Sequence, residues 1–74
     1  MENIPEMLPV ISSNVNAVGY DEEKKELHVK FNNGSYYKYL NVGLDVYKSL
    51  RAAESVGKYL NTNIKNVYQF VKVG

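Results

Sequence analysis

The most informative stretch of this sequence is residues 27–40, which read LHVKFNNGSYYKYL. Leu27, Val29 and Phe31 alternate with polar residues, and this period of two is typical of a strand with one buried face. Asn32-Asn33-Gly34 favours a tight turn, and the aromatic residues after it favour a second strand. The stretch therefore predicts a β-hairpin.

The length of the turn determines which side chains of the hairpin face the core. A two-residue turn would place Lys38 opposite Val29 on the apolar face, where an ammonium group is costly. A three-residue loop with Gly34 at positive φ pairs Val29 with Tyr37 instead. We therefore expect Tyr37 and Tyr39 to be half-buried packing residues. The same register places four side chains on the opposite face: His28, Lys30, Tyr36 and Lys38.

The segments around the hairpin predict a single α+β domain over residues 12–74. Residues 14–20 favour a strand, and a polar turn follows them. Apolar residues at helical spacing predict one short amphipathic helix starting near Asp45 and a second that Ser55 can cap. Residues 67–73 favour a last strand. The predicted order is β-β-β-α-α-β, an antiparallel sheet with two short helices packed on one face.

Residues 1–11 contain two prolines and no regular apolar period, so we expect an extended N-terminal arm. Two roles fit such an arm: it covers a sheet edge, or it binds a partner. Glu2 and Glu6 occupy positions where a secretion signal carries basic residues, and we therefore expect no export signal.

The composition limits the class of protein. A chain of 74 residues holds one domain, and 45% hydrophobic with 23% charged residues is typical of a globular protein. The absence of cysteine excludes disulfides and thiolate metal sites. No apolar run approaches the roughly 18 residues that span a bilayer. We expect a soluble, cytoplasmic protein without a membrane partner.

Residues that could support catalysis are scarce. His28 is the sole histidine, with no cysteine to complete a metal site or nucleophile pair, and we expect it to be a solvated strand residue. The carboxylates of residues 21–26 crowd one turn, where solvation explains them. The glycines are isolated, so no phosphate-binding loop is present. We expect no enzyme, cofactor, metal or small-molecule substrate.

The charges are distributed unevenly along the chain. Six acidic and two basic side chains give residues 1–26 a net charge of −4, whereas two acidic and seven basic give residues 27–74 a net charge of +5. Tyr36 between Lys30 and Lys38 is the arrangement by which RNA-binding sheets stack bases and hold phosphates. The alternative is that these groups are separate, solvated surface residues. The candidate nucleic-acid contacts are Lys30, Tyr36, Lys38, His28, Arg51 and Lys58.

The segment after Ala53 combines a helix cap with a glycine. Ser55 can cap the second helix, and Gly57 in its first turn lets the backbone approach a neighbouring strand or a ligand closely. Packing is sufficient to explain both residues, and an anion held by these amides and Lys58 is the alternative. The residues that we assign a structural role are Gly34, Tyr37, Tyr39, Ser55 and Gly57.

Several short segments resemble the KTSC domain in residue type, order and spacing, and together they cover residues 12–73. That family takes its name from the C-terminus of some lysyl-tRNA synthetases and also occurs as small free-standing bacterial and phage proteins. Gly43 departs from the pattern, because many members carry proline there. The synthetase connection suggests RNA as a ligand. The segments that carry the resemblance are Ser13-Asn14-Val15, Val18-Gly19-Tyr20-Asp21, Phe31-Asn32-Asn33-Gly34, Tyr37-Lys38-Tyr39, Val46-Tyr47 and AESVGKYLN at 53–61.

Two functions remain open on these grounds. The leading hypothesis is a small, non-catalytic binding module for RNA or single-stranded nucleic acid. The competing hypothesis is a protein-interaction module, which binds another protein or self-associates as a homodimer through a sheet edge and the arm.

Overall fold

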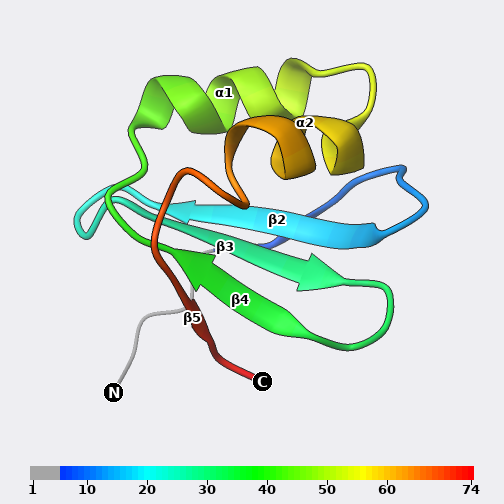
Figure 1. The fold of residues 1–74 in the computed structure, drawn as a ribbon, viewed down its shortest axis with the longest axis horizontal. Coiled ribbons are helices and arrows are strands. Elements are labelled where there is room, and N and C mark those ends of the chain that lie inside the picture. Colours follow the sequence, from blue (N-terminus) through cyan, green and yellow to red (C-terminus); the bar gives the residue numbers. More distant parts are fainter. Residues whose placement is uncertain (1–5) are drawn as a thin grey trace.

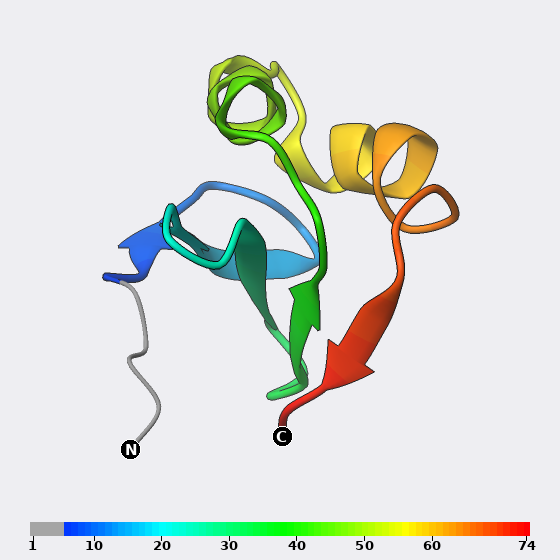
Figure 2. The ribbon, with the colours of Figure 1, turned by 90° about the vertical axis from the view of Figure 1, so that its left-hand side faces the viewer.

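The computed structural model describes residues 6–74, in which an antiparallel sheet carries two helices on one face (Figure 1). The strands follow one another in space as in sequence: β1 (Leu8–Pro9), β2 (Val15–Asp21), β3 (Glu26–Phe31), β4 (Tyr36–Tyr39) and β5 (Phe70–Lys72). Between β4 and β5 the chain forms α1 (Leu44–Ala52) and α2 (Val56–Asn63). Figure 2 shows both helices on the same side of the sheet. The predicted α+β class is confirmed, with the arm supplying an additional first strand.

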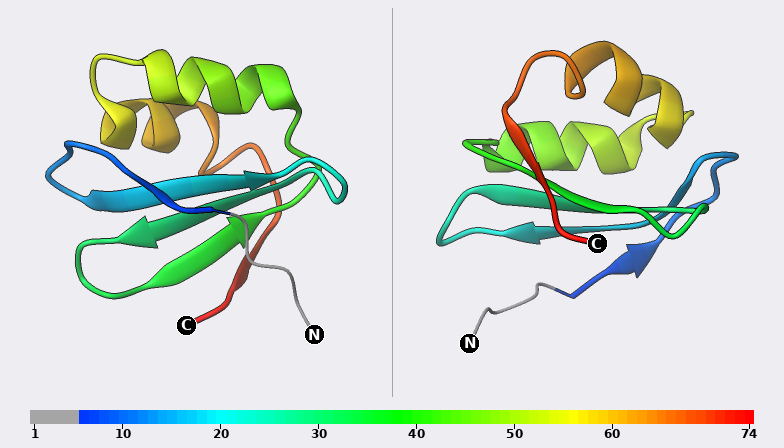
Figure 3. Two further views of the ribbon diagram at one scale, coloured as in Figure 1. Left: turned by 180° about the vertical axis from the view of Figure 1, so that it is seen from behind. Right: turned by 60° about the horizontal axis from the view of Figure 1, so that its bottom comes forward.

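The described part of the N-terminal arm lies along a sheet edge. Leu8 pairs with Val18 and Pro9 with Ala17, so β1 runs antiparallel to β2 (Figure 3). Pro9 fits there because an edge strand does not need every backbone N–H. The edge-covering role is therefore the one seen for residues 6–11, and residues 1–5 of the predicted arm lie outside the described residues.

The hairpin has the register expected for a three-residue loop. Leu27 pairs with Tyr39 and Val29 with Tyr37, and Gly34 has a φ of 93°. The loop is closed by the Phe31 amide, which donates to the Ser35 carbonyl at 2.8 Å. A glycine is needed at this point because side chains disfavour positive φ. The predicted alignment of the two strands is confirmed.

The core lies between the sheet and the two helices, as the apolar spacing predicts. Tyr37 is half-buried, but Tyr39 is more deeply buried than predicted, with 2% of its surface exposed. Tyr39 belongs to the core cluster, and Phe70 of β5 also contacts it, with the two ring centroids 6.0 Å apart. The fully buried aliphatic side chains come from both layers: Val15, Val18, Leu27, Val29, Val42, Leu50, Leu60 and Ile64.

Local interactions set the bounds of α2 and β5. The Lys58 amide donates to Ser55 Oγ at 3.3 Å, which confirms the predicted cap. β5 starts later than the predicted strand because the chain after α2 continues in turns, where the amides of Val67 and Tyr68 donate to the Ile64 carbonyl. Neither helix of the described residues has the length and apolar character that crossing a membrane requires.

Candidate ligand-binding groove

The outer face of the sheet, which points away from α1 and α2, holds His28 in a buried position. His28 is 6% exposed, and its Nδ1 lies 2.9 Å from the Tyr36 hydroxyl. That hydroxyl in turn donates to Met7 Sδ at 3.6 Å. The prediction of a solvated His28 is wrong, because the N-terminal arm packs against the sheet at this point. Tyr36 is half-buried for the same reason.

Lys38 and Lys30 on the outer face have different surroundings. Lys38 Nζ lies 3.6 Å from Glu26 Oε2, and its side chain is only 17% exposed. The same carboxylate approaches His28 Nε2 at 3.8 Å. Lys30 is exposed. Glu26 therefore offsets part of the positive charge that the sequence places around Tyr36.

The two remaining candidate contacts lie on the helices. Arg51 belongs to α1, where its guanidinium carbon lies 6.0 Å from the centroid of the Tyr47 ring. Lys58 belongs to the first turn of α2 and its side chain is exposed. The six predicted contact residues are thus divided between the outer face and the helical layer. The fold does not bring them together on one surface.

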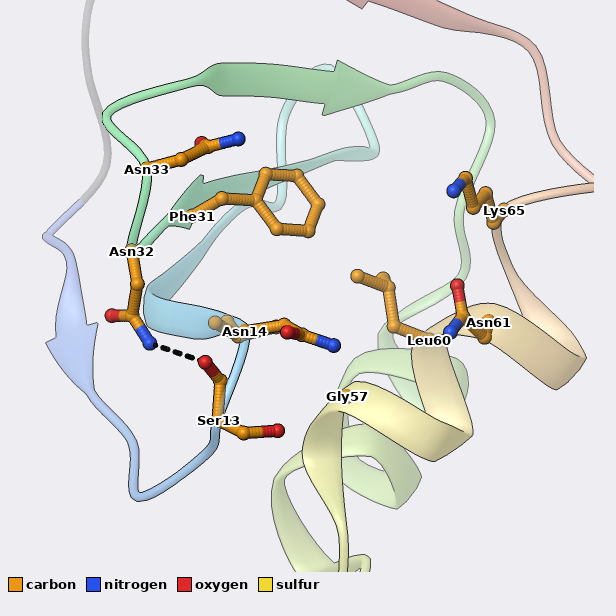
Figure 4. A pocket seen from close by; sticks show the side chains of 10 residues that line it. Ser13, Asn14, Phe31, Asn32, Asn33, Gly57, Leu60, Asn61 and Lys65 are labelled. Carbon is orange, nitrogen blue, oxygen red and sulfur yellow. Dashed lines mark hydrogen bonds between the residues drawn. The ribbon is translucent and has the colours of Figure 1, made fainter.

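A cleft of about 530 Å³ opens between the end of the β3–β4 hairpin and α2 (Figure 4). Nine of its ten lining residues belong to the three separated segments at 13–15, 31–34 and 53–61. Lys65, just after α2, is the tenth. The residues that line the cleft are Ser13, Asn14, Val15, Phe31, Asn32, Asn33, Gly57, Leu60, Asn61 and Lys65.

Two of the asparagines hold the wall of the cleft in place. Asn32 Nδ2 donates to the carbonyl oxygens of Ser12 and Ser13 at 3.2 and 3.0 Å. Asn33 Oδ1 accepts the Ser35 amide at 2.9 Å, which stabilises the hairpin loop. The Asn32 carboxamide therefore connects the β3–β4 loop to the loop before β2, and the Asn33 carboxamide holds the β3–β4 loop itself.

Gly57 brings α2 close to the loop before β2. A Cβ atom at this position would lie 3.0 Å from Ser12 Oγ, and this hydroxyl accepts the amides of Asn14 and Val15. The close approach predicted for Gly57 is present, but its partner is the Ser12 side chain of this loop and not a strand. The small residue fixes the spacing across one end of the cleft.

Asn14, Asn61 and Lys65 present polar groups to the cleft. Within residues 6–74 the side-chain amides of Asn14 and Asn61 form no hydrogen bond, and Lys65 forms no ion pair. Figure 4 shows Asn14 extending toward α2 and Lys65 extending toward Phe31. A carboxamide offers both donors and an acceptor, and a lysine offers a cation. This end of the protein can therefore bind a polar, anionic ligand.

A smaller cavity of about 250 Å³ continues from the cleft toward β5. It shares Phe31, Asn33 and Lys65 with the cleft, so we treat the two as one groove. Its walls are aromatic: the Phe31 ring meets Tyr37 edge-on at 5.7 Å, and Phe70 lies 5.5 Å from Tyr37. Phe70 remains 54% exposed. The groove therefore combines an amide-rich cleft with an aromatic cavity.

The charge around the groove is positive. In the described part of the chain no carboxylate lines the cleft or the smaller cavity, and Lys65 lines both. Lys72 pairs with Tyr37 across β4 and β5, which places it on the same face of the sheet. The acidic turn at 21–26 lies at the opposite end of the β2–β3 hairpin (Figure 1). The fold thus separates the acidic turn from the groove.

Comparisons with known proteins show the family of this chain. Residues 11–68 match the KTSC domain family. The protein belongs to the KTSC family. A KTSC domain protein from Yersinia pestis has a crystal structure that superimposes with a TM-score of 0.89 at 29% identity, covering 96% of this chain and all of that one.

Two relatives extend the comparison to other bacteria. A protein from Tsukamurella paurometabola is 38% identical over 65 residues, which are 88% of this chain and 97% of the relative. An uncharacterized protein from Stutzerimonas stutzeri is 37% identical over 54 residues, which are 73% of this chain and 76% of the relative.

The groove includes residues that the sequence did not indicate as ligand contacts. Asn14 and Asn61 occur in the segments that resemble the family, Phe31 was predicted to be a residue of the hairpin strand, and Lys65 is one of the seven basic residues of 27–74. A usable signal was present, because three of those segments, at 13–15, 31–34 and 53–61, are far apart in sequence yet each carries an asparagine. Tyr37, which the sequence analysis assigned a structural role, also lines the groove.

Proposed function

We propose that this KTSC protein is a non-catalytic, cytoplasmic binding module that holds single-stranded nucleic acid in the groove. The observation that carries the proposal is the convergence of three separated KTSC segments on one cleft. Counting residues 6–74, that cleft offers a lysine and two carboxamides without a hydrogen bond, those of Asn14 and Asn61, and no carboxylate lines it. The site proposed first from sequence, around Tyr36, is replaced by this groove.

Each part of the groove matches a part of a nucleotide. The exposed ring of Phe70 offers a surface on which a base can stack. The carboxamides of Asn14 and Asn61 can bond to the donors and acceptors on a base edge. Lys65 can neutralise a phosphate, the main source of affinity for nucleic acid. Unpaired bases are needed, because a duplex hides their edges and faces.

The test is a titration of labelled single-stranded RNA and DNA with the wild-type protein and two lysine variants. We expect affinity that falls steeply with salt and that Lys65→Gln lowers by about tenfold, the effect of one charge-assisted contact. The matched control is Lys48→Gln, an exposed lysine of α1 outside the groove. The proposal fails if no oligonucleotide binds at low salt, or if both variants behave alike.

A second candidate function is protein interaction through β5. This strand is at the edge of the sheet, and exposed apolar side chains surround it: Val67, Phe70, Val71 and Val73. An open edge with apolar side chains is suited to pairing with another strand. Sedimentation would then show a mass that rises with concentration, and Val71→Lys would keep the protein monomeric. A wild-type monomer at all concentrations, with no captured partner, excludes this candidate.

A further inference from the structure

We infer that the groove binds two consecutive nucleotides, one in each cavity, with the linking phosphate at Lys65; this rests on the proposed function. The groove is not uniform, because its two cavities differ in volume and in lining. Lys65 lines both of them and is, among residues 6–74, the only charged residue that lines either. A chain passing from one cavity to the other crosses this lysine.

The cleft is suited to reading a base. Its volume of about 530 Å³ falls in the range of small-ligand sites, which run from roughly 300 to 1,000 Å³. Asn14 and Asn61 come from opposite walls, the loop before β2 and α2 (Figure 4). A base between them meets amide donors and acceptors on two sides, and these discriminate one base edge from another. We expect sequence preference at this nucleotide.

The smaller cavity is suited to stacking. Its volume is about 250 Å³, and four of its lining residues are aromatic: Phe31, Tyr37, Tyr39 and Phe70. Its one carboxamide, that of Asn33, already accepts the Ser35 amide. Stacking tolerates every base, since each has a flat aromatic face. We expect this nucleotide to add affinity with little preference for its base.

The position of Lys65 favours a phosphate between the two bases. Its backbone amide donates to the Leu60 carbonyl at 2.8 Å, so the residue is held at the end of α2. Its side chain is exposed and forms no ion pair within residues 6–74. Lys72 lies beyond the second cavity, on the strand that also carries Phe70. The two lysines therefore mark a path for the phosphates along the groove.

The experiment compares a nucleoside monophosphate, a dinucleotide and a tetranucleotide on the full-length protein. We expect the dinucleotide to bind about tenfold more tightly than the monophosphate, because a second stacked base adds affinity. The further gain in affinity from the dinucleotide to the tetranucleotide should be much smaller. Changing the base at one end of the dinucleotide should alter affinity, and changing it at the other end should not. Phe70→Leu keeps apolar bulk at the strand edge but removes the ring.

Phe70→Leu should reduce dinucleotide affinity to near that of the monophosphate and leave monophosphate binding unchanged. Lys48→Gln is the control and should change neither. The inference is overturned, and the proposed function kept, if oligonucleotides bind in a Lys65-dependent manner but the mono- and dinucleotide bind equally. It is also overturned if Phe70→Leu weakens both ligands to the same extent. Failure of all three ligands and of longer strands overturns both proposals and favours a protein partner.

Discussion

The side chain of Asn32, in the β3–β4 loop, donates a hydrogen bond of 3.0 Å to the carbonyl oxygen of Ser13, in the loop before β2. The same Nδ2 also reaches the Ser12 carbonyl at 3.2 Å. The backbone reinforces the link, because the Asn32 amide donates to the Asn14 carbonyl at 2.8 Å. One residue thus joins two of the segments that line the cleft.

Asn32→Ala removes these side-chain bonds and leaves two carbonyls to water. The carbonyls are at the surface, so we expect a stability loss of only about 1 kcal/mol, measured by urea unfolding. Because the loop that carries Asn14 loses its hydrogen bonds to the Asn32 side chain, the free energy of nucleic-acid binding should fall by more than the free energy of unfolding does. Asn16→Ala, an exposed position in β2 away from the cleft, is the control. Equal affinity in wild type and Asn32→Ala would contradict this role.

Met7 shields His28 on the outer face. Its Sδ would lie 2.8 Å from a Cβ at Gly19, and Gly19 pairs with His28 across the sheet. Met7→Ala should therefore expose the imidazole and cost about 1 kcal/mol, since the side chain is half-buried. The readout is modification of His28 by diethyl pyrocarbonate, followed by mass spectrometry.

Ile11→Ala provides the control for this experiment, because Ile11 is fully exposed. It should leave both stability and the modification rate unchanged. His28 is the sole histidine, so the modified residue is unambiguous. A modification rate in Met7→Ala equal to that of the wild type would show that Met7 does not shield His28.

Tyr20 connects β2 to the segment that leads into α1. Its hydroxyl donates to the carbonyl of Val42, and its ring stacks on Tyr47 with centroids 5.2 Å apart. Tyr20→Phe keeps the stacking but leaves the carbonyl without its partner, so we expect a loss of about 1–2 kcal/mol in unfolding free energy. Tyr59→Phe is the matched control, because no hydrogen bond of the Tyr59 hydroxyl occurs within residues 6–74. Equal losses in the two variants would rule out this role for the hydroxyl.

Two tyrosines, the buried Tyr39 and the half-buried Tyr20, make the stability depend on alkaline pH. Burial raises the pKa of Tyr39 above its ordinary value of 10.0, and the neighbouring Tyr37 contributes in the same direction. Burial also raises the pKa of Tyr20, with Glu22 and Asp45 adding to the effect. The unfolded chain therefore ionises first as pH rises. Stability is fully present below pH 10 and falls as pH rises from there through the folded-state pKa values.

The measurement is thermal unfolding across this pH range for wild type and Tyr39→Phe. The variant lacks one of the two hydroxyls whose pKa the fold raises, so its stability should decline less steeply above pH 10. Tyr59→Phe again provides the control for removal of a tyrosine hydroxyl. Parallel declines in wild type and Tyr39→Phe would show that burial of Tyr39 does not govern the alkaline loss.

Local sequence was enough to predict the hairpin and both helices. The alternation of Leu27 and Val29 with polar residues, together with the glycine at the loop, fixed the pairing of Val29 with Tyr37. The Ser55 cap could also be predicted from neighbouring residues. Strand period, turn chemistry and helix capping depend on residues within a few positions of one another.

The burial of His28 and the composition of the groove could not be predicted in this way. Asn14, Asn32 and Asn61 are residues of one type, yet the folded chain gives the Asn32 side chain a structural hydrogen bond and leaves the amides of the other two facing the cleft. His28 appeared solvated because an alternating strand says nothing about an arm that crosses its polar face. These outcomes depend on contacts between segments that are distant in sequence, and local patterns do not specify such contacts.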